Sequence, residues 1–145
     1  METKEIIKRW KGNQRYTLKL IQAMPEEEFD FKAAEGTKSF RSQCSHITTW
    51  LRTHSRFVTE KEMDKLKPKS KEEIVQALNG FFDDFIAFLQ GTNEDELAQK
   101  VKVFYGTLSK EFIIQTMDNH LSHHRGQMII YLRLKGITPP SYIGW

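Results

Sequence analysis

The chain has 145 residues, 39% hydrophobic and 28% charged, a balance typical of one globular domain over residues 1–145 that needs no disulfides. Its net charge of +3 comes from 22 basic and 19 acidic residues of mostly alternating sign, and no predicted helix has a basic face, which argues against a nucleic-acid partner. No segment approaches the roughly 18 consecutive apolar residues of a membrane span, and the N-terminus METKEIIKRW lacks a signal-peptide pattern. We therefore expect a cytoplasmic protein that does not enter a membrane.

The first half of the chain predicts two amphipathic helices. Apolar residues near helical spacing predict a helix from Thr3 to about Met24, which Pro25 ends. The segment PEEEFDFKAAEGTK has no sustained period and predicts a connection. A second helix is predicted from about Ser39 to Met63. Its apolar stripe consists of Phe40, Cys44, Ile47, Leu51 and Val58, and Cys44 is the only cysteine of the chain.

The second half predicts two more helices, separated by a short extended piece. Ser70 and Glu73 match a capping box, so a third helix is predicted to begin there and to run to about Gln90. The segment KVKVFYG alternates apolar and polar residues, which indicates an extended piece too short to define a sheet. A fourth helix is predicted to begin near Ser109 and to end at Gly136. Four such helices predict an all-α protein, an up-and-down four-helix bundle with a short extended segment before the last helix.

The fourth helix contains three of the five histidines within the stretch DNHLSHHRGQM. On a helical wheel centred on Met117, His120 and His124 fall at roughly −60° and −20°, on the apolar face and one turn apart. Two imidazoles at this spacing are typical of a metal site. His123 falls at roughly 120°, beside the core.

Each of the two core-facing histidines has a plainer interpretation, as a buried side chain bonded separately to a carbonyl or carboxylate. A metal site in a bundle also needs a ligand from a second helix. The second helix offers His46, at the border of its stripe, and His54, nearer the centre of the stripe. They lie two turns apart, roughly 12 Å, so one ion does not easily bind both. Periodicity does not choose between them.

Two stretches resemble a known family over nearly the whole chain. DNHLSHHRGQM followed by YLRLKGITPP is similar to the last helix of the DinB family, and PEEEFDFKAAEGTKSFRSQCSHITTWL resembles that family's approach to its second helix. The resemblance implies a bundle in which three histidines bind a divalent metal, often zinc or nickel. At the matching positions these histidines are His46, His120 and His124, so the resemblance favours His46 over His54, which then reads as a core or pocket residue.

The resemblance also implies chemistry. Some proteins similar to this one are thiol transferases that conjugate bacillithiol or mycothiol to electrophiles, and others are described as metal-dependent hydrolases. A small-molecule substrate and a low-molecular-weight thiol are therefore the expected partners, and a non-catalytic metal- or small-molecule-binding protein is the alternative. A homodimer is also expected from the resemblance, and the helical Gly126, which faces away from the apolar stripe, is a candidate contact for it.

Several neighbours of the predicted ligands are candidates for supporting roles. Gln127 lies one turn from His124, where it either orients a ligand or a bound water or is an ordinary exposed glutamine. No acidic residue falls in the histidine stripe, so His123 is the nearest candidate for proton transfer. A further set either walls a pocket around the metal or belongs to the ordinary aromatic core: Trp50, Phe57 and Tyr131.

Overall fold

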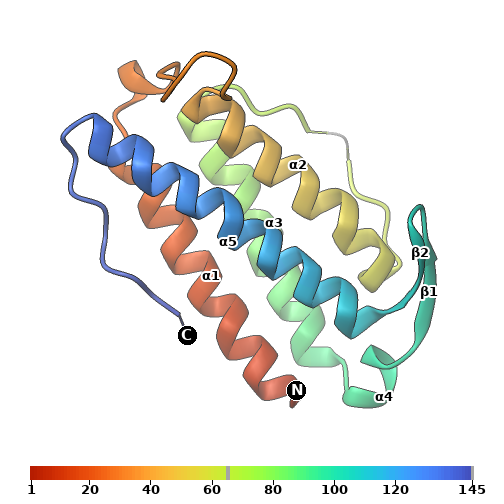
Figure 1. Cartoon of the computed structure of the whole chain (residues 1–145). Helices are drawn as coiled ribbons and strands as arrows, with labels where there is room; N and C mark the ends of the chain where they lie inside the picture. Colours follow the sequence, from red (N-terminus) through yellow and green to blue (C-terminus); the bar gives the residue numbers. More distant parts are fainter. Residues whose placement is uncertain (65, 145) are drawn as a thin grey trace.

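A computed structural model describes residues 1–64 and 66–144. Four long helices form a bundle (Figure 1): α1 Thr3–Ala23, α2 Phe40–Thr59, α3 Lys71–Gly91 and α5 Lys110–Leu134. Shorter elements connect them: the 3-10 helix η1 Glu26–Glu28, α4 Glu94–Leu97, and the strands β1 Lys100–Val103 and β2 Gly106–Ser109. The predicted four-helix bundle is confirmed.

Side-chain contacts between helices define the direction of each. Gln14 of α1 contacts Asn79 and Asp83 of α3, whereas Lys71, at the start of α3, reaches the end of α1, so these two helices are antiparallel. Gln43 of α2 contacts Gln127 of α5, whereas His46, farther along α2, faces His120, so α2 and α5 are also antiparallel. Contacts from Arg9 to Asp118 and from Arg125 to Thr17 make α1 and α5 parallel.

It follows that α2 and α3 run in the same direction, so the order is up-down-down-up, whereas strict up-and-down connectivity reverses at every step. The reason is the length of the connection between Thr59 and Lys71. The 20 residues of α2 span about 30 Å. A chain of eleven residues, 60 to 70, reaches about 36 Å when extended. It is therefore long enough to return along the bundle, as Figure 1 shows.

The predicted helix boundaries hold at the N-termini of all four long helices and fail at one C-terminus. The Ser70–Glu73 capping box is present, and the side chains of Ser39 and Ser109 accept hydrogen bonds from the first turns of α2 and α5. The prediction that the second helix runs to Met63 is wrong. It ends at Thr59, where Glu60 adopts a left-handed conformation with φ of 58°. Met63 lies five residues beyond Val58, off the helical stripe, and packs against the core from the connection.

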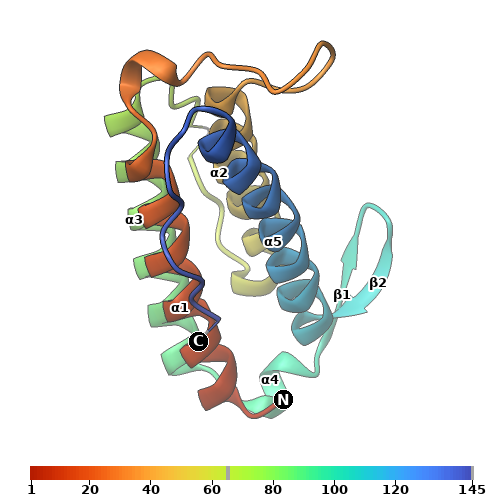
Figure 2. The ribbon, with the colours of Figure 1, turned by 60° about the vertical axis from the view of Figure 1, so that its left-hand side comes forward.

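The predicted extended piece is one strand of a hairpin. Lys100–Val103 pairs antiparallel with Gly106–Ser109, so the expectation that it was too short to define a sheet is corrected. The sequence GTLS has little apolar alternation, which is why its pairing was not apparent from the pattern. Figure 2 shows this hairpin and the connection between α1 and α2 projecting from the same side of the bundle, beyond α2 and α5.

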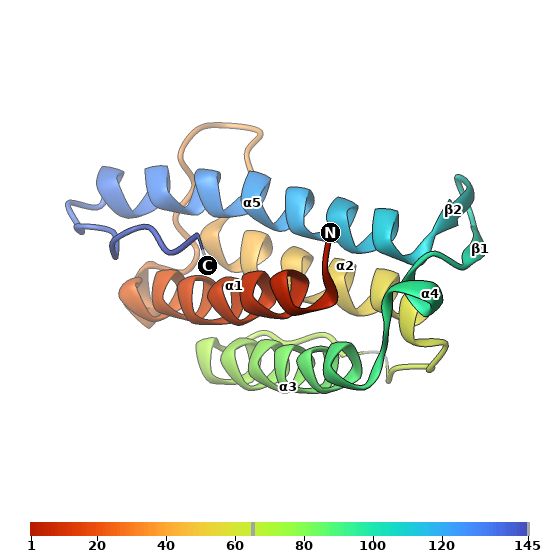
Figure 3. The ribbon, with the colours of Figure 1, turned by 90° about the horizontal axis from the view of Figure 1, so that it is seen from below.

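All four long helices contribute to the apolar core, and a group of aromatic rings fills it between α1 and α3. Trp10 packs edge-on against Phe81 and Phe85 and at a tilt against Phe82, and all four rings are buried. Figure 3, seen from below, shows α1 and α3 on one side of the bundle and α5 on the other. Cys44 is buried, as predicted. Among the described residues, none of the helices is long and apolar enough to span a membrane.

Gly126 lies exposed on the outer face of α5, and a Cβ atom added there would meet nothing within 4 Å. The fold of one chain therefore does not require glycine at this position. The homodimer contact expected there stays a prediction.

Candidate metal centre

The antiparallel packing of α2 against α5 brings together three histidines that are far apart in sequence. His46, on α2, faces His120 and His124, which lie one turn apart on α5. The Nε2 atoms of His46 and His120 are 3.4 Å apart, and those of His120 and His124 are 3.2 Å apart. One ligand atom from each of the three residues lies within 4.8 Å of the others.

The two Nε2–Nε2 separations that involve His120 fit a tetrahedral metal site. With metal–nitrogen bonds of about 2.05 Å, two nitrogens of a tetrahedron lie about 3.4 Å apart. Three histidines also leave room for a further ligand, as in catalytic zinc sites. The donor set suits zinc and nickel, since imidazole is a preferred ligand of both.

The three imidazoles are held neutral, which is the form that binds metal. Burial, with a smaller contribution from neighbouring histidines, lowers the pKa of His120 and of His124 to about 4. Burial also lowers the pKa of His46. The charged groups with the strongest influence on these pKa values are other histidines and Lys38, not carboxylates. The cluster therefore offers uncharged lone pairs at neutral pH.

A chain of hydrogen bonds fixes the tautomer of His124. Its Nδ1 lies 2.6 Å from Oε1 of Gln43, which can only accept, so Nδ1 carries the proton and Nε2 is free for a metal. Nε2 of Gln43 donates to Oε1 of Gln127 at 2.6 Å, and Gln127 in turn donates to Nε2 of His123 at 3.1 Å. The chain therefore runs from a predicted ligand to an exposed histidine.

Sequence reasoning left two interpretations of Gln127 open, an orienting role or an ordinary exposed glutamine, and it did not identify Gln43. The structure places Gln43 against Nδ1 of His124, and Gln127 accepts a hydrogen bond from Gln43. One signal was present in the sequence: Gln43 lies next to Cys44 and one helical turn before His46, among the inward-facing residues of α2. A buried glutamine there requires a polar partner.

On the other side of the cluster, Trp50 stacks against His120 with ring centroids 3.9 Å apart. The opposite face of the indole stacks on His54 at 3.6 Å, and Nδ1 of His54 donates to the Trp50 carbonyl oxygen. His54 is thus a buried residue that supports Trp50, and the structure does not bring it to the other three histidines. Phe57 packs against His54 and Phe104, farther from the three clustered histidines than Trp50.

Tyr131 lies at the other edge of the cluster. Its hydroxyl donates to the carbonyl oxygen of Lys38 at 2.5 Å, and its ring packs against Phe31 and Phe40. A cavity of about 480 Å³ opens beside His124 at this point. It is lined by Thr37, Lys38, Gln43, His123, His124, Gln127, Ile130 and Tyr131. Of the three predicted pocket aromatics, only Tyr131 lines this cavity.

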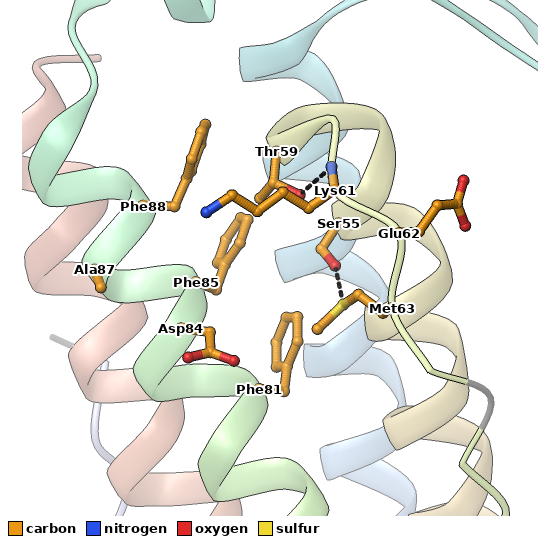
Figure 4. Close-up of a pocket in the computed structure, with 10 residues that line it drawn as sticks. All are labelled: Ser55, Thr59, Lys61, Glu62, Met63, Phe81, Asp84, Phe85, Ala87 and Phe88. Atoms are coloured by element: carbon orange, nitrogen blue, oxygen red, sulfur yellow. Dashed lines mark hydrogen bonds between the residues drawn. The ribbon is translucent and has the colours of Figure 1, made fainter.

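A separate cleft of about 440 Å³ lies between α2, α3 and the connection that follows α2 (Figure 4). Phe81, Phe85 and Phe88 line it from α3, and Ser55 donates a hydrogen bond to the sulfur of Met63 on the opposite side. None of the described residues that line this cleft is a histidine, so it is distinct from the candidate metal centre.

The face of α5 that points away from the histidines is anchored to α1 by buried polar groups. Arg125 donates to Asn13 at 2.9 Å and lies over the ring of Tyr16. Asn13 in turn donates to Asp118 at 2.8 Å, and Asp118 also accepts from Arg9. These contacts fix the rotation of α5, and with it the direction in which His120 and His124 point.

Solved structures of similar fold are known from several bacteria. A DinB-like protein from Bacillus cereus matches with a TM-score of 0.84 at 22% identity, covering 94% of each chain. YjoA, a DinB-like protein from Bacillus subtilis, matches with a TM-score of 0.79 at 18% identity, covering 97% of this chain and 99% of its own. A structure from Exiguobacterium sibiricum, described as a member of the DinB family, has a TM-score of 0.71 at 21% identity and covers 92% and 91%.

Comparison of sequences alone agrees with the structural matches. YjoA of Bacillus subtilis, an uncharacterised protein, is 19% identical over 143 residues, which cover 94% of this chain and 93% of YjoA. The model of the DinB family matches residues 1–144. With the bundle, the three converging histidines and this match over almost its whole length, the chain belongs to the DinB family.

Proposed function

We propose that this chain is a metal-dependent enzyme that transfers a low-molecular-weight thiol to a small electrophile, or hydrolyses such a substrate. In this proposal His46, His120 and His124 are the ligands of a zinc or nickel ion. The observation that carries it is the convergence of three neutral imidazoles: Nε2 of His120 lies 3.4 Å from that of His46 and 3.2 Å from that of His124, and one ligand atom from each histidine lies within 4.8 Å of the others. A divalent ion on three neutral imidazoles keeps its full charge and lowers the pKa of a coordinated thiol or water towards neutrality.

The residues around the cluster have distinct parts in this proposal. Gln43 holds His124 in the tautomer that binds metal, and Trp50 restricts the ring of His120. His123, exposed at the cavity and hydrogen-bonded to Gln127, is the group placed to exchange a proton with substrate or solvent. Tyr131 and Ile130 provide the less polar wall against which a small substrate packs.

The alternative is a protein that binds metal or a small molecule at the same centre without turnover. It is favoured by the lack of a carboxylate among the described residues that line the cavity, since hydrolytic zinc sites commonly pair the ion with a general base. Thiol transfer does not need such a base, because coordination itself deprotonates the thiol. For this reason we place thiol transfer ahead of hydrolysis.

The test is an activity assay on protein whose metal content has been measured. Zinc- and nickel-loaded samples are incubated with a panel of low-molecular-weight thiols and a chromogenic electrophile, and separately with chromogenic esters and amides. We expect conjugation that is lost in metal-free protein and in the His120→Ala variant. Bound metal with no conjugation or hydrolysis across the panel would favour the non-catalytic alternative.

A further inference from the structure

The cavity beside His124 has an uneven distribution of charge. None of the described residues that line it is acidic, and several carry side chains that can donate hydrogen bonds, among them Lys38, Gln127 and His123. A metal ion on the adjacent histidines would add positive charge to the same space. A cavity of one sign of charge attracts ligands of the opposite sign.

Among the described residues that line this cavity, Lys38 is the one lysine or arginine, and its backbone is held in place. The carbonyl oxygen of Lys38 accepts the hydrogen bond from Tyr131, which ties the end of the α1–α2 connection to α5. Within residues 1–64 and 66–144 its ammonium group makes no ion pair, in contrast to Lys110 and Lys135. Its charge also reaches the histidines, because it contributes to lowering the pKa of both His46 and His124.

We propose that Lys38 selects substrates that carry a carboxylate or phosphate group, by pairing with that group while another atom of the substrate reaches the three-histidine centre. This inference rests on the proposed function and adds to it the class of substrate, a small organic anion. A cavity of about 480 Å³ is in the range of small-molecule sites, so the two ends of one such molecule fit within it.

Three small thiols with the same two-carbon spacer test the proposal on cobalt-loaded protein. 3-Mercaptopropionate, 2-mercaptoethanol and cysteamine share the HS–CH2–CH2– unit and end in a negative, neutral or positive group. Their binding is followed by the thiolate-to-cobalt charge-transfer absorption, which does not require turnover. We expect the affinity to decrease in that order.

The contribution of Lys38 is isolated by comparing variants. Lys38→Met is expected to lower the affinity for 3-mercaptopropionate about three- to fivefold, the range of a partly exposed ion pair. The affinity for 2-mercaptoethanol should stay unchanged. Chelation of cobalt by the carboxylate is the same in both proteins, so it cancels in the comparison. Lys32→Met is the matched control, because Lys32 is an exposed lysine of the same connection that does not line the cavity.

A second arm, on metal-free protein, separates this proposal from the metal centre. Propionate, inorganic phosphate and propanol are titrated while the NMR signals of the Gln127 side-chain amide are followed. We expect the anions but not propanol to shift these signals, and Lys38→Met to abolish the shift. The anion that binds more tightly, propionate or phosphate, shows whether the site recognises a carboxylate or a phosphate group. If cobalt does not bind but these shifts occur, the metal proposal fails and the role of Lys38 stands. If Lys38→Met matches the wild type in both arms, the role of Lys38 is wrong.

Discussion

At the scale of single residues, sequence reasoning placed some parts of the candidate site and missed others for a physical reason. The helical wheel of the last helix put His120 and His124 on one face, and the structure shows their rings together. On the second helix, periodicity did not choose His46 over His54, because periodicity ranks residues by burial. His54 is only 4% exposed, whereas His46 is half-buried at the α2–α5 groove. A ligand must reach a neighbouring helix and remain accessible, so the centre of an apolar stripe is a poor guide to it.

The role of Gln43 leads to a prediction about metal affinity. In the Gln43→Ala variant His124 loses the acceptor that fixes its tautomer, and we expect zinc affinity to fall about 10- to 100-fold. Gln43→Glu keeps an acceptor oxygen and should retain more of the affinity. Competition with a chromogenic chelator measures both, with the exposed Gln115→Ala as control. Unchanged affinity in Gln43→Ala would show that the hydrogen bond does not orient the ligand.

The lowered pKa values of the histidines predict how the stability of metal-free protein depends on pH. His120 and His124 titrate near pH 4 when folded and near their ordinary value of 6.5 when unfolded, so the unfolded chain binds more protons between these values. The free energy of unfolding should therefore fall as the pH decreases from about 6.5 towards 4. Above about 6.5 these two groups should have no effect.

Thermal unfolding of metal-free protein between about pH 7 and 5 checks this, since most carboxylates stay ionised in that range. The wild type should lose thermal stability as the pH falls, and a variant with both His120→Asn and His124→Asn should lose less. An equal slope in the two proteins would mean that the two histidines do not titrate as described.

At the scale of elements, local signals predicted where helices begin better than where they end. Serine caps at Ser39, Ser70 and Ser109 are specific, because a side-chain oxygen satisfies a free backbone amide. The end of α2 has no such signal, since its capping residue is Glu60 in a left-handed conformation that usually favours glycine. The partner strand of the hairpin was missed because its position depends on pairing and not on its own sequence.

The pairing of α1 with α5 depends on Asn13, which links Arg125 to Asp118. In Asn13→Ala the buried Arg125 loses an acceptor and the half-buried Asp118 loses a donor. We expect this to lower the free energy of unfolding by about 2–3 kcal/mol. Asn79→Ala, at an exposed site on α3, is the control and should change it far less. Chemical denaturation measures both. A loss in Asn13→Ala no larger than in Asn79→Ala would indicate that the polar contacts do not stabilise the α1–α5 packing.

At the scale of the whole molecule, the direction of the helices decides which faces meet. The chain returns along the bundle after α2, so α2 and α3 are parallel and α2 can pack antiparallel to α5. That pairing places His46 opposite His120 and His124. Sequence periodicity predicts four apolar stripes but not their order around the core, because each stripe is satisfied by more than one neighbour. The resemblance to the DinB family supplied what periodicity lacked.

The central claim is that His46, His120 and His124 together bind one divalent ion. Elemental analysis of tag-free wild-type protein, beside His120→Ala, tests it most directly. The account predicts about one zinc or nickel ion per chain in the wild type, as purified or after loading and removal of excess metal, and a large loss of bound metal in His120→Ala. A wild-type protein that contains no metal and does not bind added zinc or nickel stoichiometrically would contradict it.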